Sequence, residues 1–262
     1  MKLIKSSYEI IPQENTLEDI YKHIEKAARV CYKSEDKICE GSAKKMVDFL
    51  IKREHFGPLE HGTIYMQMNA SPAGDPYDKY INNPYSKVVL YNGWAYITTN
   101  VRVLVENDWM NDLNFMCEPT KHHVKRISVK VICDRGVTHE WVRHRPKSYC
   151  QESSRYCNYS LDKFNTSVTF IHPDWVKPED QNEFENDCKV IEALYFKWLG
   201  KGYTPQLARY FLNTGVKTEI FITAFTSDWK HFFKLRCDNA AHPDIRVLAK
   251  DVEKEFEELK YI

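Results

Sequence analysis

The sequence predicts an α+β fold, a single domain with a central, mostly antiparallel or mixed sheet packed by several helices. Three observations support this class. Helical patterns outnumber strand-like ones, and the two are mixed along the chain without regular βαβ alternation. A chain of 262 residues with a hydrophobic share of 43 % also has enough apolar material for one sizeable core. No internal repeat or low-complexity linker divides it.

The first part of the chain is predicted to form two helices and a strand. From Thr16 to Cys31 apolar residues recur at helical spacing, and Thr16 with Asp19 resembles a capping box. A second helix is predicted after Ser42, ending at the turn HFGPLEH, residues 55–61. The next residues, GTIYMQM, alternate between apolar and polar as a strand does.

The middle of the chain is harder to interpret. Residues 70–86 include Pro72, Gly74 and other turn-forming residues, which predicts a long excursion and not a domain boundary. Residues 94–107, WAYITTNVRVLVEN, suit a strand and a helix equally. A strand is predicted over about 127–133, then a turn over 134–136 and a short helix that leads into an arginine-rich segment.

The last part of the chain is predicted to be mostly helical. Pro178 opens a long helix closed by Gly200 and Gly202. Thr204 and Pro205 begin the next helix, which carries Arg209. KTEIFITAF, residues 217–225, is expected to be a strand. Two further helices are predicted, one capped by Thr226 or Ser227 and extending to about Arg236, the other following His242 and Pro243.

The composition limits the classes of function. Lys+Arg and Asp+Glu are both 37, so the chain lacks the overall positive field that draws proteins to nucleic acids or anionic membranes. The 8 cysteines form no CxxC pair, and neither a signal-peptide pattern nor a long apolar span is present. We therefore expect a cytoplasmic protein with reduced cysteines and no membrane or nucleic-acid partner.

The segment RHRPKSYCQESSRY, residues 143–156, concentrates cationic and hydroxyl groups. It holds three arginines, a lysine, a histidine and three serines. Arginine binds phosphate through two parallel hydrogen bonds, and serine hydroxyls add donors around the same oxygens. The segment could therefore bind two phosphate groups. From residue types alone, the alternative stays open that these arginines pair with nearby carboxylates and that the serines are ordinary loop residues.

The spacing in this segment resembles that of a known family. Arg-His-Arg, seven further residues, a serine and then Ser-Arg-Tyr is similar to the signature of the flavin-dependent thymidylate synthases. Four other blocks resemble that family in the same order over nearly the whole chain: AARVCY (27–32), HFGPLEH (55–61), LARYFLN (207–213) and HFFKLRCDNAAHPDIR (231–246). One block alone would be weak evidence, whereas five in order are specific.

The resemblance implies a function. It implies FAD-dependent reductive methylation of dUMP to dTMP, with 5,10-methylenetetrahydrofolate as carbon donor and NADPH as reductant. It also implies a homotetramer whose subunits share active sites. Relative to short members of the family, residues at about 70–124 are an insertion within the single domain 1–262, and its role is open.

The resemblance also implies site residues, position by position. The candidate cofactor-binding residues are His55, Gly57, Arg143, His144, Arg145, Gln151 and His231. The candidate dUMP-binding residues are Glu140, Arg143, Gln151, Glu152, Ser153, Ser154, Arg155, Arg209 and Arg236. Arg236 is the candidate catalytic residue, since an arginine against the uracil favours ionisation at N3 and makes C5 more nucleophilic.

Several positions have competing interpretations. His55 and His61 could bond backbone carbonyls, and Arg236 could pair with Asp238 or Asp244. Phe225 stands where some relatives place an asparagine near the flavin. Cys150 superficially resembles the nucleophile of the flavin-free thymidylate synthases and is expected to be incidental.

Other classes of function also stay open. No metal site is expected, because the spacing of His122, His123, Cys133 and His139 fits no zinc pattern. A nucleic-acid-binding module would use Tyr149 and Tyr156 for stacking. A flavoprotein with another reaction would not need Arg209 and Arg236.

Overall fold

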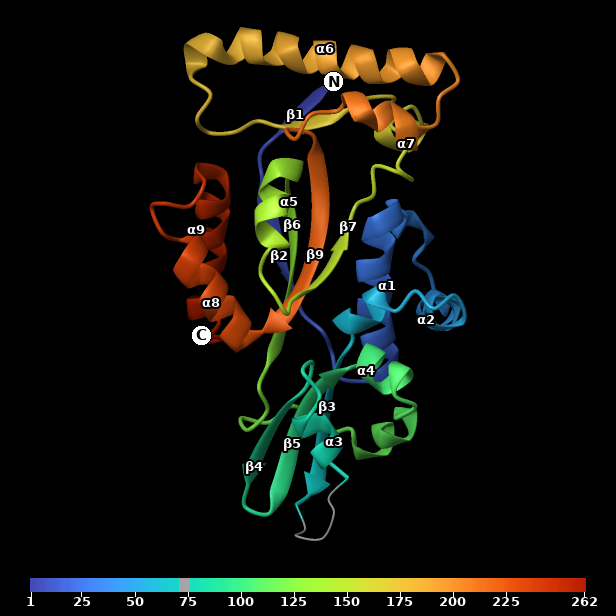
Figure 1. The fold of residues 1–262 in the computed structure, drawn as a ribbon, viewed down its shortest axis with the longest axis vertical. Helices are drawn as coiled ribbons and strands as arrows, with labels where there is room; N and C mark the ends of the chain where they lie inside the picture. Colours follow the sequence, from blue (N-terminus) through green and yellow to red (C-terminus); the bar gives the residue numbers. More distant parts are fainter. Residues whose placement is uncertain (71–75) are drawn as a thin grey trace.

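The computed structural model, which describes residues 1–70 and 76–262, contains three sheets (Figure 1). The central sheet is antiparallel, with the order β2 (Ser7–Ile11), β6 (Arg126–Asp134), β9 (Lys217–Phe225) and β7 (Ser148–Gln151). A second antiparallel sheet has the order β3 (Thr63–Asn69), β5 (Trp94–Asn100) and β4 (Lys87–Tyr91). A small parallel pair joins β1 (Lys2–Ile4) to β8 (Thr169–Ile171). The predicted α+β class is confirmed.

The helices surround these sheets. Figure 1 shows α1 and α2 on one side of the central sheet, α5, α8 and α9 on the other, and α6 across one end. The α-helices are α1 (Leu17–Tyr32), α2 (Ser42–Lys52), α3 (Asp78–Ile81), α4 (Val101–Glu106), α5 (Arg135–Trp141), α6 (Gln181–Gly200), α7 (Pro205–Ala208), α8 (Thr226–Arg236) and α9 (Pro243–Glu258). The 3₁₀ helices are η1 (Glu35–Lys37), η2 (Gly57–His61), η3 (Met110–Phe115), η4 (Asp162–Phe164), η5 (Pro178–Asp180) and η6 (Arg209–Phe211).

The two faces of the central sheet differ in polarity because side chains alternate along each strand. One face presents apolar residues such as Val129 and Ile222 to the aromatic residues of α8, and this cluster forms the main core. The opposite face carries Ser128 and Thr223, which are buried and bonded to each other through their hydroxyls at 2.6 Å. This polar face is covered by α1 and η2.

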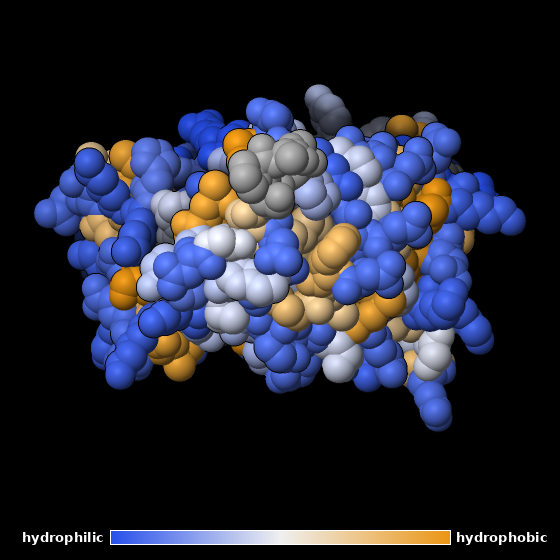
Figure 2. All heavy atoms as spheres, turned by 90° about the horizontal axis from the view of Figure 1, so that it is seen from below, coloured by the Kyte–Doolittle hydropathy of each residue, from blue (hydrophilic) through white to orange (hydrophobic). Residues whose placement is uncertain are grey.

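The sheet β3-β5-β4 shares a core with the first two helices. Ile20 and Ile24 of α1, Leu59 of η2 and Ile97 of β5 are all fully buried in one cluster. Figure 2 views the molecule from the end that carries this sheet and shows hydrophobic residues among mostly hydrophilic ones. The residues of this sheet are therefore integrated into the fold and are not an appendage of it.

Two predicted boundaries were wrong. Residues 134–136 form no separate turn, because Asp134 caps α5 directly by accepting a 2.8 Å hydrogen bond from the Val137 N–H. Neither Thr226 nor Ser227 caps α8, since the helix begins at Thr226 straight after β9 and has no side-chain cap. The predicted helical segment that carries Arg209 is present, since the short helix α7 continues directly into η6, where Arg209 lies.

Other predictions are confirmed. Thr16 caps α1 through the Asp19 N–H, and the strands at 63–69, 126–134 and 217–225 are present. The ambiguous residues 94–107 form both elements, β5 and then α4. Of the predicted excursion, Pro72 and Gly74 lie outside the described residues, and the part that follows contains α3. No helix in residues 1–70 or 76–262 is long and apolar enough to cross a membrane.

Candidate active site

The Arg-His-Arg segment lies between the end of α5 and the start of β7. Arg143 and Arg145 are exposed, whereas His144 is buried. The Nε2 atom of His144 accepts a 2.8 Å hydrogen bond from Nε of Arg236. Burial, followed by the charges of Lys147 and Arg236, lowers the pKa of His144 to about 4. His144 is therefore neutral at pH 7, with its proton on Nδ1, because the guanidinium can only donate.

Arg236 is held by a carboxylate as well as by this imidazole. Its NH1 group donates to Oε2 of Glu140, and NH2 lies 3.4 Å from the Glu140 carbonyl. The pairings with Asp238 or Asp244 that the sequence left open are not made. Arg143 lies 3.8 Å from Glu140, and the His231 and His144 ring centroids are 6.3 Å apart. The ends of α5 and α8 thus bring Glu140, Arg143, His144, His231 and Arg236 together.

A second group of candidate residues follows β7. Gln151 donates to Oγ1 of Thr138 at 3.0 Å, which connects this strand to α5 two residues before Glu140. Ser154 is buried and accepts a 3.2 Å hydrogen bond from NH1 of Arg209, while Arg155 is exposed. Hydroxyl and guanidinium donors therefore converge at Ser154 and Arg209, next to Ser153 and Arg155.

Glu152 has a different environment from its neighbours. Its side chain is 1 % exposed, and Oε2 accepts from Lys217 at 2.8 Å. A buried carboxylate paired with a lysine in this way has its charge already compensated. The structure thus pairs Glu152 with Lys217 inside the protein.

His55 and Gly57 are on the exposed turn that leads into η2. Within the described residues the His55 side chain makes no hydrogen bond or ion pair with the other candidate residues. His61 is fully buried, and its Nδ1 lies 2.7 Å from the Thr223 hydroxyl. Its partner is therefore a side chain of β9 and not a backbone carbonyl. Burial lowers the pKa of His61 well below its usual range.

Arg126 is a functional candidate that the sequence reasoning missed. Its NH1 group donates to the Glu60 carbonyl at 2.9 Å, and NH2 donates to the Ser148 hydroxyl at 3.2 Å. Burial lowers the pKa of Arg126 to about 10, and its Nε atom is buried without a hydrogen-bond partner. The guanidinium lies 5.5 Å from the Phe225 ring. An arginine at the first position of a strand that is predicted to be largely buried was the available signal.

Lys147, in the arginine-rich segment, packs against α8. Its Nζ atom lies 3.7 Å and 4.1 Å from the ring centroids of Trp229 and Phe232. The ammonium group is buried without a hydrogen-bond partner, and burial lowers the pKa of Lys147 well below its usual range. Contact with two aromatic faces compensates part of the cost of burying this group. The helix that carries His231 and Arg236 is thereby tied to residues 143–148.

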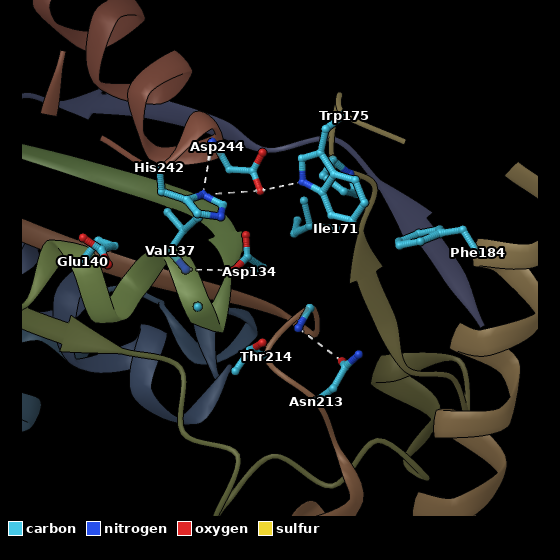
Figure 3. Close-up of a pocket in the computed structure, with 13 residues that line it drawn as sticks. Asp134, Val137, Glu140, Ile171, Trp175, Phe184, Asn213, Thr214, His242 and Asp244 are labelled. Atoms are coloured by element: carbon cyan, nitrogen blue, oxygen red, sulfur yellow. Dashed lines mark hydrogen bonds and ion pairs between the residues drawn. The ribbon is translucent and has the colours of Figure 1, made fainter. Parts of the chain in front are cut away.

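A pocket of about 400 Å³ adjoins the first group of residues (Figure 3). Among the candidate site residues only Glu140 lines it, together with Asp134, Val137, Asn213, Thr214, Trp175, His242 and Asp244 and others. Trp175 donates to Asp244 from Nε1 at 3.3 Å. The arginines of residues 143–155 lie outside the pocket lining, so they face open surface and not an enclosed cavity within one chain.

The donor set of this region suits phosphorylated ligands. Arg143, Arg145, Arg155 and Arg209 are exposed, and the Ser154 hydroxyl is bonded to Arg209. In the described part of the chain no group of three or more histidines, cysteines or carboxylates could hold a metal ion. Fold and site together define an α+β protein with a cluster of exposed arginines at the edge of its central sheet.

Comparisons with known proteins identify the family. The family described as "Thymidylate synthase complementing protein" matches residues 14–73 and 118–259. The chain belongs to this family, which confirms the resemblance to the flavin-dependent thymidylate synthases. The match leaves out residues 74–117, which include α3, β4, β5, α4 and η3.

The individual relatives match only part of the chain. The chain is 38 % identical over 120 residues to the flavin-dependent thymidylate synthase of Pyrococcus furiosus, covering 45 % of this chain and 48 % of that protein. It is 29 % identical over 172 residues to the enzyme of the same name from Sulfurisphaera tokodaii, covering 65 % and 64 %. The chain spans about half the length of the Pyrococcus relatives that it matches. Among solved structures the chain is similar to a UMP/dUMP methylase, PolB, from Streptomyces cacaoi bound with 5-Br dUMP. The TM-score is 0.48 and the identity 18 %, and the match covers 99 % of this chain and 93 % of that chain.

Proposed function

We propose that this protein is a flavin-dependent thymidylate synthase that methylates dUMP to dTMP. The observation that carries the proposal is the arrangement of Arg236 at the end of α8, bonded to His144 and Glu140 beside the arginine- and serine-rich segment. Family membership supports the same reaction. Arg209 and Arg236, which a flavoprotein acting without dUMP would not need, both lie among other candidate residues.

The nucleotide phosphate is assigned to the group that follows β7. Ser153, Ser154, Arg155 and Arg209 would bind it, with Gln151 near the sugar. The hydrogen bond between Arg209 and Ser154 supports this assignment, since both groups are donors and a phosphate oxygen can accept from both. Arg155 and Arg209 then balance the charge of the phosphate locally. A local positive charge is needed because the chain as a whole has no net charge to attract an anion.

Arg236 is assigned to the uracil ring. His144 accepts from its Nε and Glu140 from its NH1, so the guanidinium plane is fixed while N–H groups on its terminal nitrogens stay available for a ligand. A fixed cation beside the uracil would stabilise negative charge that develops at N3, because no reorganisation is needed at the moment of reaction. The nucleophilicity of C5 rises as a result. Glu140 and His144 position Arg236 in this scheme.

The residues present fit FAD. Arg143 and Arg145 are exposed cations suited to its pyrophosphate, and the unpaired Nε of Arg126 lies beside Phe225, where some relatives have a polar flavin contact. His144, His231, Gln151, His55 and Gly57 complete the proposed set. When bound, FAD would supply hydride chemistry between NADPH and the methylene carbon donated by 5,10-methylenetetrahydrofolate. The protein supplies binding and orientation.

The proposal includes an assembly. His55 and Gly57 are exposed at the start of η2, which packs against β7 of the same chain, and the exposed arginines of the segment face open surface. In a homotetramer with shared active sites, the turn that carries His55 would contact the arginine-rich segment of a neighbouring subunit. We place the assembled enzyme in the cytoplasm. Light scattering of the purified protein measures the assembly independently of activity.

The test of function combines three measurements on the full chain. We expect flavin absorbance after addition of FAD, NADPH oxidation stimulated by dUMP, and dTMP once methylenetetrahydrofolate is added. Flavin binding without any effect of dUMP would favour a flavoprotein with another reaction. Absence of flavin binding together with steeply salt-dependent binding of single-stranded oligonucleotides would overturn the proposal in favour of a nucleic-acid-binding module.

A further inference from the structure

Two cysteines meet at the free edge of the central sheet. Cys150 lies on β7, the edge strand, and is 4 % exposed in a small cluster with Ala27, Val30 and Phe221. Cys31, in the last turn of α1, packs against the same cluster and is partly exposed. The two residues come from distant parts of the sequence and share one contact surface between helix and strand.

Contacts between the end of α1 and the residues at the end of β7 bring these two cysteines together. The Cys31 carbonyl accepts a 3.0 Å hydrogen bond from the Ser153 N–H, just beyond the end of β7. The Cys31 side chain packs against the cluster that contains Cys150, and each thiol shifts the pKa of the other. The neighbouring rings of Tyr32 and Tyr156 lie 5.1 Å apart, so the end of α1 stays against residues 150–156. The pair is therefore held in contact by both chain segments.

The two thiols have different properties. The hydrogen bond from Cys150 and the bond from the Gln151 backbone lower the pKa of the Cys31 thiol, against the effect of burial. The pKa of Cys150 is raised well above its usual range by its bond to Cys31 and by burial. Because the thiolate is the reactive form, Cys31 is the nucleophile of the pair and Cys150 the enclosed partner.

We propose that Cys31 and Cys150 form a peroxide-reactive pair that closes to an intramolecular disulfide. The Cys31 thiolate attacks one oxygen of hydrogen peroxide, which breaks the O–O bond and gives Cys31 sulfenic acid and, after protonation, water. The Cys150 sulfur then attacks the Cys31 sulfur and expels a second water. The two thiols lose two electrons and hydrogen peroxide gains them, so the balance is two thiols and one peroxide to one disulfide and two waters.

The disulfide would act on the residues beside it. Cys31 holds the Gln151 and Ser153 backbone at the edge of β7, so a bond that draws its sulfur toward Cys150 changes that contact. This consequence rests on the proposed function, in which Gln151 and Ser153 bind dUMP. We expect the oxidised protein to lose most of the thermal stabilisation that dUMP gives the reduced protein.

The primary experiment uses the unaltered full chain. The protein is titrated with hydrogen peroxide, remaining thiols are alkylated, and digests are analysed by mass spectrometry before and after dithiothreitol. We expect one reducible cross-linked peptide joining Cys31 and Cys150, formed at least tenfold faster than oxidation of Cys237. Cys237 is a matched control, being partly buried at the end of α8, where burial followed by Glu253 raises its pKa to about 12.

Variants separate the two steps. Cys150→Ser should stop at Cys31 sulfenic acid, which dimedone traps, and Cys31→Ser should form neither product. Cys237→Ser should still form the cross-link. Absence of the Cys31–Cys150 peptide in the unaltered chain, or cross-links to other cysteines at equal rates, would overturn the proposal whether or not dUMP binds. A cross-link without loss of dUMP stabilisation would retain the disulfide and remove its effect on the site.

Discussion

Arg236 shows how one residue is prepared by its neighbours. It is fixed between a neutral imidazole and a carboxylate, both of which come from α5 or from the segment after it. The pair with Glu140 is only partly exposed, with side-chain exposures of 17 % and 25 %. Partial burial strengthens the electrostatic interaction compared with a surface ion pair. The guanidinium is therefore oriented before any ligand arrives.

Arg236→Ala should lower dTMP formation by about a hundredfold or more, the usual effect of removing one fixed donor to a developing negative charge. Flavin absorbance should remain, because the exposed Arg143 and Arg145 are unchanged. The assay is dTMP production at saturating dUMP, with the visible spectrum recorded on the same sample. Lys234→Ala removes an exposed cation from the same turn of α8 and should have little effect. An active Arg236→Ala variant would contradict the uracil role.

The sequence predicted residues better when a pattern of neighbours marked them. The resemblance to the family led to Glu140, His144 and Arg236, which the structure brings together. Arg126 and Lys147 were missed, since their importance lies in what surrounds them: two backbone segments for Arg126, and two aromatic rings for Lys147. Such contacts depend on packing between elements, which residue order does not reveal.

At the scale of elements, η2 is held tightly against α1. A β-carbon added to Gly62 would lie 2.6 Å from Cδ1 and 2.8 Å from Cγ1 of Ile24, a residue that is fully buried. Gly57, at the other end of the same turn, has open space around the corresponding position. η2 therefore has no space for a side chain at Gly62, where it packs against α1, and has open space at Gly57, next to His55.

Gly62→Ala should therefore reduce the free energy of unfolding by roughly 1–3 kcal/mol through overpacking. Gly57→Ala should leave stability unchanged, and it should weaken FAD binding if the proposed flavin contact is correct. Urea unfolding measures the first effect and flavin titration the second. Equal stability of the two variants would show that α1 yields easily to the added methyl group.

Elements were predicted where periodicity is long and missed where it is short. Helix α1 and strands β6 and β9 have enough residues to show a repeat. Strands β1 and β7 have three and four residues, and β7 lies inside a segment dominated by charges and hydroxyls. The pairing of β7 with β9 defines this strand, and that pairing is a long-range contact invisible to local pattern analysis.

At the scale of the whole molecule, neutral buried histidines couple folding to pH. Burial lowers the pKa of His23 to about 3, with smaller effects from nearby charges, and lowers that of His61 well below its usual range. The pKa of His144 falls to about 4. In the unfolded chain each imidazole titrates near its ordinary value of about 6.5. Between these values the unfolded state binds more protons, so stability falls as pH falls.

The free energy of unfolding should drop between pH 7 and pH 5, with each of these imidazoles contributing roughly 2 kcal/mol between pH 6.5 and pH 5. Urea unfolding at several pH values measures the slope. His23→Gln should flatten it, whereas His139→Gln, a change at an exposed position, should not. Constant stability from pH 7 to pH 5 would mean that the unfolded and folded states bind protons equally in this range.

The strand pairing of the two larger sheets determines which of them can form first during translation. β6 has β2 on one side and β9 on the other, and Arg126 of β6 pairs with Phe225, which follows it much later in the sequence. β3, β5 and β4 find their partners within residues 63–100. On the ribosome the sheet β3-β5-β4 can be complete while the central sheet still lacks a strand. Arg236 and the helix that carries it follow β9 in the sequence, so the candidate active site can form only after the sheet β3-β5-β4 has been synthesised.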